Sequence, residues 1–200
     1  MSRTEQKLKT RQRILEAAGR GFRKGGFGGV GVDGLAKEAG VTSGAFYVHF
    51  ASKATAFHES VAQGMSDLKQ GIRHFQREHG QNWWTEFVHF YLSTKRTCDL
   101  SESCVLQTLT PEVARADASA RATFEAELLN VATIMTTGPA SADAPSDVDA
   151  AWSALATLIG AVTLARAVND PALSERIAAA TEEVLLPSCA AKAAPEPEKS

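Results

Sequence analysis

The sequence has few cysteines, no long uncharged segment and no secretory signal. Its three cysteines, at positions 98, 104 and 189, form no CxxC pair and are odd in number, which argues against a disulfide framework. The longest uncharged run, 150–165, is shorter than the roughly 20 residues of a membrane span. No apolar signal segment follows Met1. We therefore expect a cytoplasmic protein without a membrane partner.

Sequence motifs of common catalytic and metal sites are also missing. We find no phosphate-binding loop, no glycine-rich dinucleotide motif after a strand, no nucleophile elbow and no recognisable set of catalytic side chains. His74 and His79 are five residues apart, whereas two metal ligands on one helix prefer positions i and i+4. The expectation is a protein that is not an enzyme and holds neither a metal nor another cofactor.

The charge is unevenly distributed along a chain of ordinary globular composition. Of the 200 residues, 44% are hydrophobic and 22% are charged, which suits a folded chain of one or two domains. Residues 1–58 carry ten basic and four acidic residues, a net charge of +6, and the other 142 residues have a net charge of −8. This asymmetry suggests a nucleic-acid surface near the N-terminus, although a solvated basic helix is the alternative.

The hydrophobic pattern predicts an all-α protein. Apolar residues recur with the helical period between glycine and proline breaks, and no segment alternates with the period of a strand. The predicted helices cover residues 8–24, 32–39, 43–49, 52–78, 82–97, 103–115, 118–136, 147–168 and 171–186. Segment 138–146 is predicted to be a loop, and segment 190–200 a disordered tail.

The second and third predicted helices have the spacing of a helix-turn-helix. A tight turn at Gly40 and Val41 joins them, and Thr42 is suited to cap the third helix. Phe46 and Phe50 share one face of that helix, so we expect them inside and Tyr47 outside. The outer face of such a helix can enter a DNA major groove.

The stretch from Ile14 to about Phe57 resembles the TetR family of transcriptional regulators. The resemblance rests on ILEAAGRGFRKGGF and on the pattern AGV-x-x-GxxY-x-HF-x-SK from Ala39 to Lys53. It implies an all-helical homodimer with a three-helix DNA-binding domain at 1–51 and an effector-binding and dimerisation domain at 52–189. The predicted disordered tail, 190–200, follows these two domains. The resemblance also implies a repressor whose small-molecule effector moves the fourth helix and releases a double-stranded DNA operator.

The resemblance assigns DNA contacts residue by residue. Tyr47, His49 and Lys53 match positions that usually contact phosphates. The positions that meet phosphates and bases are Thr42, Ser43, Gly44, Ala45 and Val48. Gly31 stands where members often carry a phosphate-binding threonine. Val48 replaces a frequent arginine, which favours contact with a thymine methyl over a bidentate base contact.

Effector and dimer contacts are predicted in the C-terminal part. The candidate effector residues are Trp83, Phe87, His89, Tyr91, Cys104 and Gln107. The candidate dimer residues are Trp152, Leu155, Ile159, Val162, Ile177 and Val184. In both sets the alternative is an ordinary place in the core of the subunit.

Cys104 suggests a second functional hypothesis, a thiol-based sensor of oxidants or electrophiles with DNA binding as its output. Some relatives with a cysteine in this region respond to such compounds. If the serines at 101 and 103 cap the sixth helix, Cys104 falls in its first turn, where the helix dipole stabilises a thiolate. The hypothesis requires a solvent-reachable thiol, and a buried, inert cysteine is the alternative.

Overall fold

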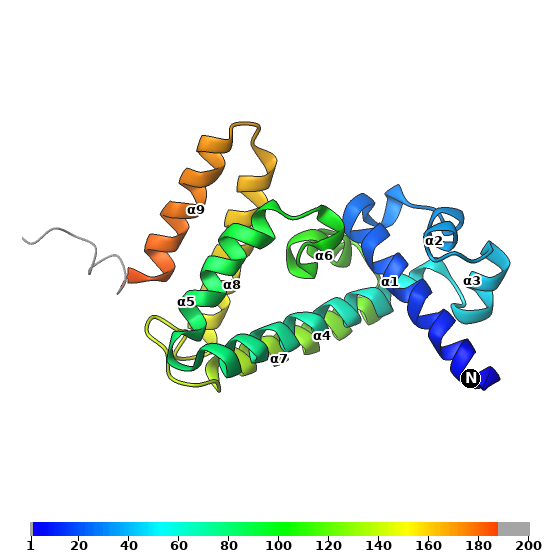
Figure 1. Cartoon of the computed structure of the whole chain (residues 1–200), viewed down its shortest axis with the longest axis horizontal. Coiled ribbons are helices and arrows are strands. Elements are labelled where there is room, and N and C mark those ends of the chain that lie inside the picture. The colour runs from blue at the N-terminus through cyan, green and yellow to red at the C-terminus, as the bar shows by residue number, and fades with distance from the viewer. Residues whose placement is uncertain (1, 188–200) are drawn as a thin grey trace, which may run out of the picture. The chain divides into compact units, whose positions relative to one another are not determined.

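The computed structural model describes residues 2–187, and these fold entirely into helices, turns and loops (Figure 1). The α-helices are α1 (Arg3–Gly29), α2 (Val32–Glu38), α3 (Ser43–His49), α4 (Lys53–His79), α5 (Trp83–Phe90), α6 (Val105–Ala114), α7 (Ala118–Thr136), α8 (Val148–Ala167) and α9 (Pro171–Leu185). Three short helical segments, η1 (Gly80–Asn82), η2 (Tyr91–Lys95) and η3 (Leu100–Glu102), lie between them. The all-α prediction is therefore confirmed, and the predicted tail lies outside the described residues.

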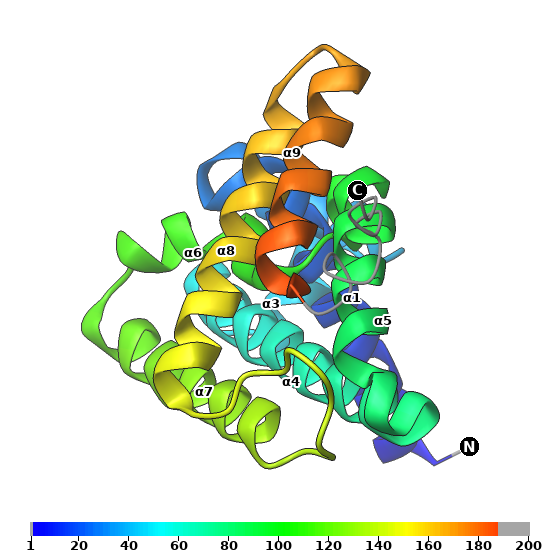
Figure 2. The same ribbon diagram turned by 90° about the vertical axis from the view of Figure 1, so that its left-hand side faces the viewer.

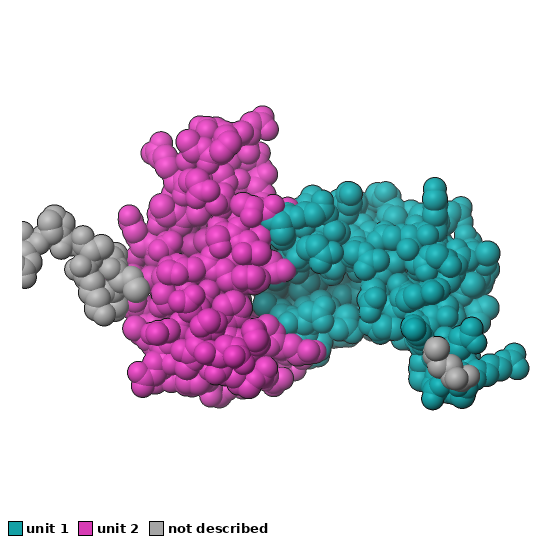
Figure 3. Space-filling view, in the orientation of Figure 1, with its two compact units in different colours: residues 1–68, 98–129 teal, residues 69–97, 130–200 magenta. Residues whose placement is uncertain are grey.

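The chain forms two compact units (Figure 3). Unit 1 comprises residues 1–68 and 98–129, and unit 2 comprises residues 69–97 and 130–200. Both α4 and α7 contribute residues to each unit. The domain boundary between residues 51 and 52 was inferred from the family resemblance, and it stays a prediction.

In unit 1, α1 packs against α2, η3 and α6, while α2 packs against α3. The fully buried side chains of Phe22, Leu35 and Phe46 come from α1, α2 and α3 respectively. Gly64 lets α4 approach α6 closely, because a Cβ atom at this position would lie 2.8 Å from the Cβ atom of Val105. The three helices of the predicted DNA-binding region thus share one core with the start of α4.

In unit 2, α8 and α9 form an antiparallel hairpin, visible from two sides in Figures 1 and 2, and both pack against the α5–η2 helix. Trp83 and Trp84 are fully buried there, and each indole N–H donates to a backbone carbonyl, of Pro139 and Leu185. The predicted helix at 82–97 is interrupted, because η2 is a π-helix. Arg166 of α8 donates to the carbonyls of Lys95 and Arg96 at its end.

By length and composition, α8 is a candidate membrane span, with a mean hydropathy of 1.6 over its most apolar window. Inside unit 2, however, its small and apolar residues at 151, 154, 158 and 162 are buried against neighbouring helices. Arg166 near its end is held by backbone carbonyls. These contacts are those of a bundle helix that packs one face against its neighbours.

The first helix begins earlier than predicted, at Arg3 rather than near residue 8. Ser2 and Glu5 form a reciprocal capping box, in which the Glu5 amide donates to Ser2 Oγ and the Ser2 amide donates to the Glu5 carboxylate. The predicted break at Gly25 and Gly26 is present as a kink, with Gly26 at φ +70°, after which the helix resumes to Gly29. The basic N-terminal arm is therefore helical.

Candidate nucleic-acid interface

The turn between α2 and α3 is built from backbone hydrogen bonds and one left-handed residue. Gly40 has φ +67°, a conformation that glycine adopts without a Cβ penalty. Its amide donates to the Lys37 carbonyl, and the Val41 amide donates to the Ala36 carbonyl. Thr42 Oγ1 then accepts from the Ala45 amide at 3.1 Å and caps α3, as predicted. This geometry sets α3 at a defined angle on α2.

Helix α3 presents one side to the core and the other to solvent. Phe46 and Phe50 are buried, with ring centroids 5.6 Å apart, which confirms that they point inward. Tyr47 and Val48 are 56% and 69% exposed. An exposed aromatic hydroxyl and an exposed valine on one helix can meet a phosphate and a thymine methyl.

The small residues at the start of α3 differ in what they can reach. Thr42 and Gly44 are exposed, and Ala45 is half-buried. The Thr42 hydroxyl accepts the capping bond, and its proton can still be donated to a phosphate. Ser43, in contrast, donates its hydroxyl proton to the Asp33 carboxylate of α2. This contact with Asp33 had no signal in the sequence.

His49 lies beside two cations from α1. Burial, Lys7 and Arg11 together lower the pKa of the His49 imidazole below its ordinary value. Its Nδ1 atom is buried and has no hydrogen-bond partner among the described residues. Arg11 pairs with Glu59 of α4 at 2.5 Å, and its guanidinium lies 4.7 Å from the centroid of Phe50. Lys7 and Arg11 supply the positive charge here, and these two side chains together with His49 are called the basic cluster.

Lys53 begins α4, whose first turn is capped by Ser52 Oγ through a 3.0 Å bond from the Thr55 amide. The Lys53 ammonium lies 4.5 Å from the centroid of the Phe27 ring, a cation–π contact. Lys53 therefore has a defined position directly after the recognition helix. The basic cluster and the Phe27 contact are tertiary features that the sequence pattern did not reveal.

The comparisons with known proteins agree with this geometry. Residues 14–59 match the family described as bacterial regulatory proteins, tetR family. The fold is similar to that of a TetR-family regulator from Agrobacterium tumefaciens, with 18% identity, a TM-score of 0.71 and coverage of 89% of this chain and 98% of that one. Residues 14–59 therefore carry the DNA-binding region of the tetR family, and the fold of the described chain is similar to that of these regulators.

Two further structures extend the likeness. A TetR-family regulator from Cytophaga hutchinsonii is 21% identical, with a TM-score of 0.69 over 92% of this chain and 96% of that one. The reduced form of NemR from E. coli is 18% identical, with a TM-score of 0.67 over 86% and 95% of the two chains. A comparison with curated proteins gave no match. The matched family consists of bacterial regulatory proteins, and the proteins from Agrobacterium tumefaciens and Cytophaga hutchinsonii are transcriptional regulators and not enzymes.

The effector residues predicted from the TetR-family resemblance divide between the two units. Cys104 and Gln107 are in unit 1, and the other four, Trp83, Phe87, His89 and Tyr91, are in unit 2. Among these four, His89 alone is exposed, and its Nε2 atom lies 3.2 Å from the Glu182 carboxylate. Within residues 2–187, no three histidine, cysteine or acidic side chains are grouped as a metal site.

Cys104 is not in the first turn of α6, as the sequence suggested. It occupies the N-cap position with an extended backbone, and Ser103 donates its hydroxyl proton to Gln107 instead of capping the helix. Its side chain is buried, with 8% exposed. The expectation of a solvent-reachable thiol is therefore wrong for this conformation, and α6 begins at Val105, two residues later than predicted.

The predicted dimer residues also divide by burial. Leu155 and Val162 are 5% and 0% exposed within their own subunit, so they pack in its core and not on an outer face. Trp152, Ile159 and Ile177 are half-buried. Val184 is 68% exposed. Leu164, which the prediction did not include, is 62% exposed. Two of the six predicted residues therefore serve the subunit itself.

Proposed function

We propose that this chain binds a double-stranded DNA operator through α3 and the side chains around it. The observation that carries the proposal is the exposed pair Tyr47 and Val48, with the basic cluster and Lys53 from α1 and α4 in the same unit. Cations at fixed positions suit phosphates, which hold the register on DNA without reading its sequence.

Base readout falls to the small and apolar residues of α3. Val48 and Ala45 offer methyl groups, which suit thymine, and Gly44 permits a close approach of the backbone. Thr42 donates its hydroxyl proton to a phosphate. Ser43 either breaks its hydrogen bond to Asp33 and donates to the DNA, or keeps that bond and so orients α3. We expect an operator whose contacted half-sites contain thymines.

We further propose a cytoplasmic homodimer that represses until a small-molecule effector releases it. The α8–α9 hairpin supports dimerisation, because Leu164 and Val184 are large apolar side chains left exposed on it. A two-fold dimer presents two copies of α3, which matches an operator with two half-sites. Release of the operator on effector binding is typical of the TetR family, and we propose it here on that basis.

The test is selection of bound DNA from a random pool by the full-length chain. We expect enrichment of an inverted repeat, and a mobility-shift titration that gives one complex with the dimer. A pool without enriched sequences would contradict the proposal. So would equal binding by the wild type and by Tyr47→Ala/Lys53→Ala, because these side chains carry the proposed phosphate contacts.

A second candidate function is the thiol sensor at Cys104, which requires a conformation that exposes the thiol, because Cys104 is buried in the structure described. Arg23 Nε donates to the Ser101 carbonyl at 2.5 Å, and burial lowers the pKa of the Arg23 guanidinium. The nearby negative charges of Glu102 and Asp67 oppose that shift. A guanidinium and a helix N-terminus close to one sulfur both favour its thiolate. The fold of the chain is also similar to that of the reduced form of NemR from E. coli.

This second candidate is tested with the same selected operator. Oxidant should release DNA from the wild type and leave the Cys104→Ser complex intact, with Cys98→Ser as the matched control. If the two cysteine variants release DNA as the wild type does, Cys104 is a packing residue and only the ligand-responsive reading stands.

A further inference from the structure

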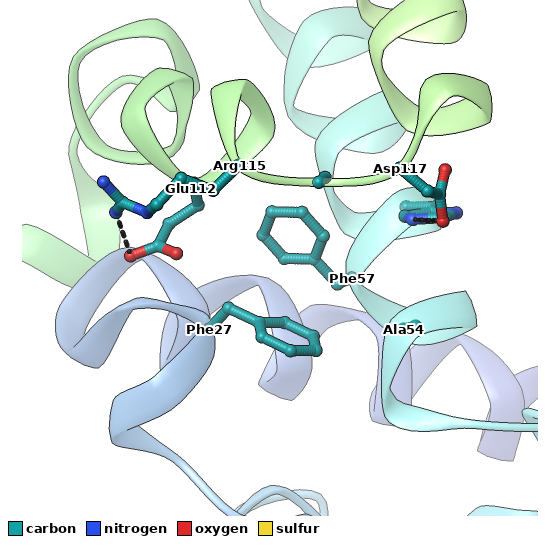
Figure 4. A pocket seen from close by; sticks show the side chains of 8 residues that line it. Phe27, Ala54, Phe57, Glu112, Arg115 and Asp117 are labelled. Carbon is teal, nitrogen blue, oxygen red and sulfur yellow. Dashed lines mark ion pairs between the residues drawn. The ribbon is translucent and has the colours of Figure 1, made fainter.

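Unit 1 contains a cavity of about 240 Å³ that lies outside the proposed DNA contacts and contains none of the predicted effector residues. Figure 4 shows it between the end of α1, the first turns of α4, and the end of α6 with the turn into α7. The side chains that define it chemically are Phe27, Phe57, His58, Glu112, Arg115 and Asp117.

Two aromatic rings form the apolar part of this cavity. The Phe27 and Phe57 centroids are 5.2 Å apart with the rings nearly perpendicular, and Phe22 supports Phe57 from the core at 5.3 Å. Gly26 places Phe27 there, because its φ of +70° bends α1 just before this residue. The Lys53 ammonium already lies over the Phe27 ring, so this ring accepts a positive charge.

Two carboxylates and one guanidinium line the cavity, and the Lys53 ammonium lies 4.5 Å from the centroid of the Phe27 ring. Glu112 pairs with Arg115 at 3.2 Å, and Asp117 lies 3.5 Å from His58. The Glu112 side chain is 23% exposed and that of Arg115 is 68% exposed, so the carboxylate lies deeper in the cavity.

We propose that this cavity binds a small organic monocation with an apolar body, such as a protonated arylalkylamine. The body packs on Phe57, whose ring lies between the Glu112 and Asp117 carboxylates in Figure 4, and the ammonium pairs with Glu112. Aromatic faces combined with a carboxylate favour a cation over a neutral or anionic molecule of the same shape. The volume limits the ligand to a small one, since drug-sized sites begin near 300 Å³.

The experiment measures binding by calorimetry with the full chain and without DNA, so its outcome is independent of operator recognition. The probes are phenethylammonium, its neutral analogue 2-phenylethanol and the anion phenylacetate. We expect the ammonium to bind about tenfold more tightly than the alcohol, and the anion to be the weakest. Glu112→Gln should remove about tenfold from the ammonium affinity and leave the alcohol unchanged.

The control is Glu125→Gln, which removes an exposed carboxylate of α7 that does not line the cavity. Asp117→Asn provides a second cavity variant, because asparagine can still cap α7 through the bond that Asp117 Oδ1 accepts from Ala120. Alanine methyl NMR signals of Ala54 and Ala116, both in the lining, should shift on addition of the ammonium. The proposal is overturned if the three probes bind alike, if none binds, or if Glu112→Gln and Glu125→Gln behave identically.

Discussion

The Lys53 ammonium lies over the ring of Phe27 at 4.5 Å, so a residue of α4 proposed to contact DNA is held by a residue at the end of α1. The two are 26 positions apart in the sequence. A side chain that is already held loses less rotamer freedom when it meets a phosphate. The position of Phe27 after the kink in α1 therefore influences how Lys53 of α4 contacts a phosphate.

Lys53→Ala should weaken binding to every DNA sequence by about tenfold and lower the salt slope by about one counterion, because a phosphate contact does not depend on the base. Phe27→Leu should weaken binding by about threefold and keep the salt slope, because the charge remains but its position is lost. Fluorescence anisotropy over a salt series measures both values. A Phe27→Leu protein that binds as tightly as the wild type would show that the ring does not position Lys53.

DNA binding should strengthen as the pH falls, and His49 is the reason. Lys7 and Arg11 add to burial in lowering the pKa of the free imidazole, whereas a phosphate near its ring raises the pKa in the complex. The complex therefore binds more protons than its free components, and affinity rises from about pH 8 to about pH 6. Anisotropy titrations of the wild type and His49→Gln check this, with a flatter pH dependence expected for the variant.

The folded protein without DNA should show the opposite trend. Because the folded His49 has a lowered pKa, the unfolded chain binds more protons, so this residue favours unfolding as the pH falls through about 6.5. Urea unfolding of wild type and His49→Gln across the same range measures this. Stability and affinity that fall together on acidification, through His49, would refute the assignment.

The exposed fraction of each side chain distinguishes residues proposed to form the dimer interface from residues in the core of the subunit. Val184→Asp and Leu164→Asp change side chains that are exposed in the subunit, and should give folded monomers in sedimentation velocity at micromolar concentration. Leu155→Ala should keep the dimer and cost about 2–5 kcal/mol of unfolding free energy, because it opens a cavity in the core. Leu129→Asp, an exposed site on α7, is the control and should stay dimeric. Dimers in both hairpin variants would place the interface elsewhere.

Gly26 should tolerate substitution less well than its neighbours. Alanine there would adopt a positive φ, and its Cβ atom would lie 2.7 Å from Glu112 Oε1, so Gly26→Ala should cost about 1–2 kcal/mol of stability. Gly28 and Gly29 have open space around a Cβ atom, and alanine at either should be neutral or stabilise by up to about 1 kcal/mol. Thermal and urea unfolding give the three values. If the three substitutions changed the free energy of unfolding equally, the left-handed conformation at Gly26 would not be required for the bend in α1.

The sequence by itself determined the helices and the turn that carries α3. The Gly40 turn, the Thr42 and Ser52 caps and the inward Phe46 and Phe50 depend on residues within a few positions, and local patterns record such interactions directly. The start of α1 was missed because the capping box of Ser2 and Glu5 precedes the first apolar residues, and the π-helix η2 has no period that apolar spacing reveals.

Only the tertiary structure decided which distant side chains meet. It placed Lys53 over Phe27, tied Ser43 to Asp33, set Lys7 and Arg11 beside His49, and joined Phe57 to Glu112 in one cavity. It also buried Leu155 and Val162 in the subunit while it left Leu164 and Val184 exposed. The physical reason is that helical periodicity tells which residues share a face, whereas the partner of that face is chosen by the packing of helices far apart in the chain.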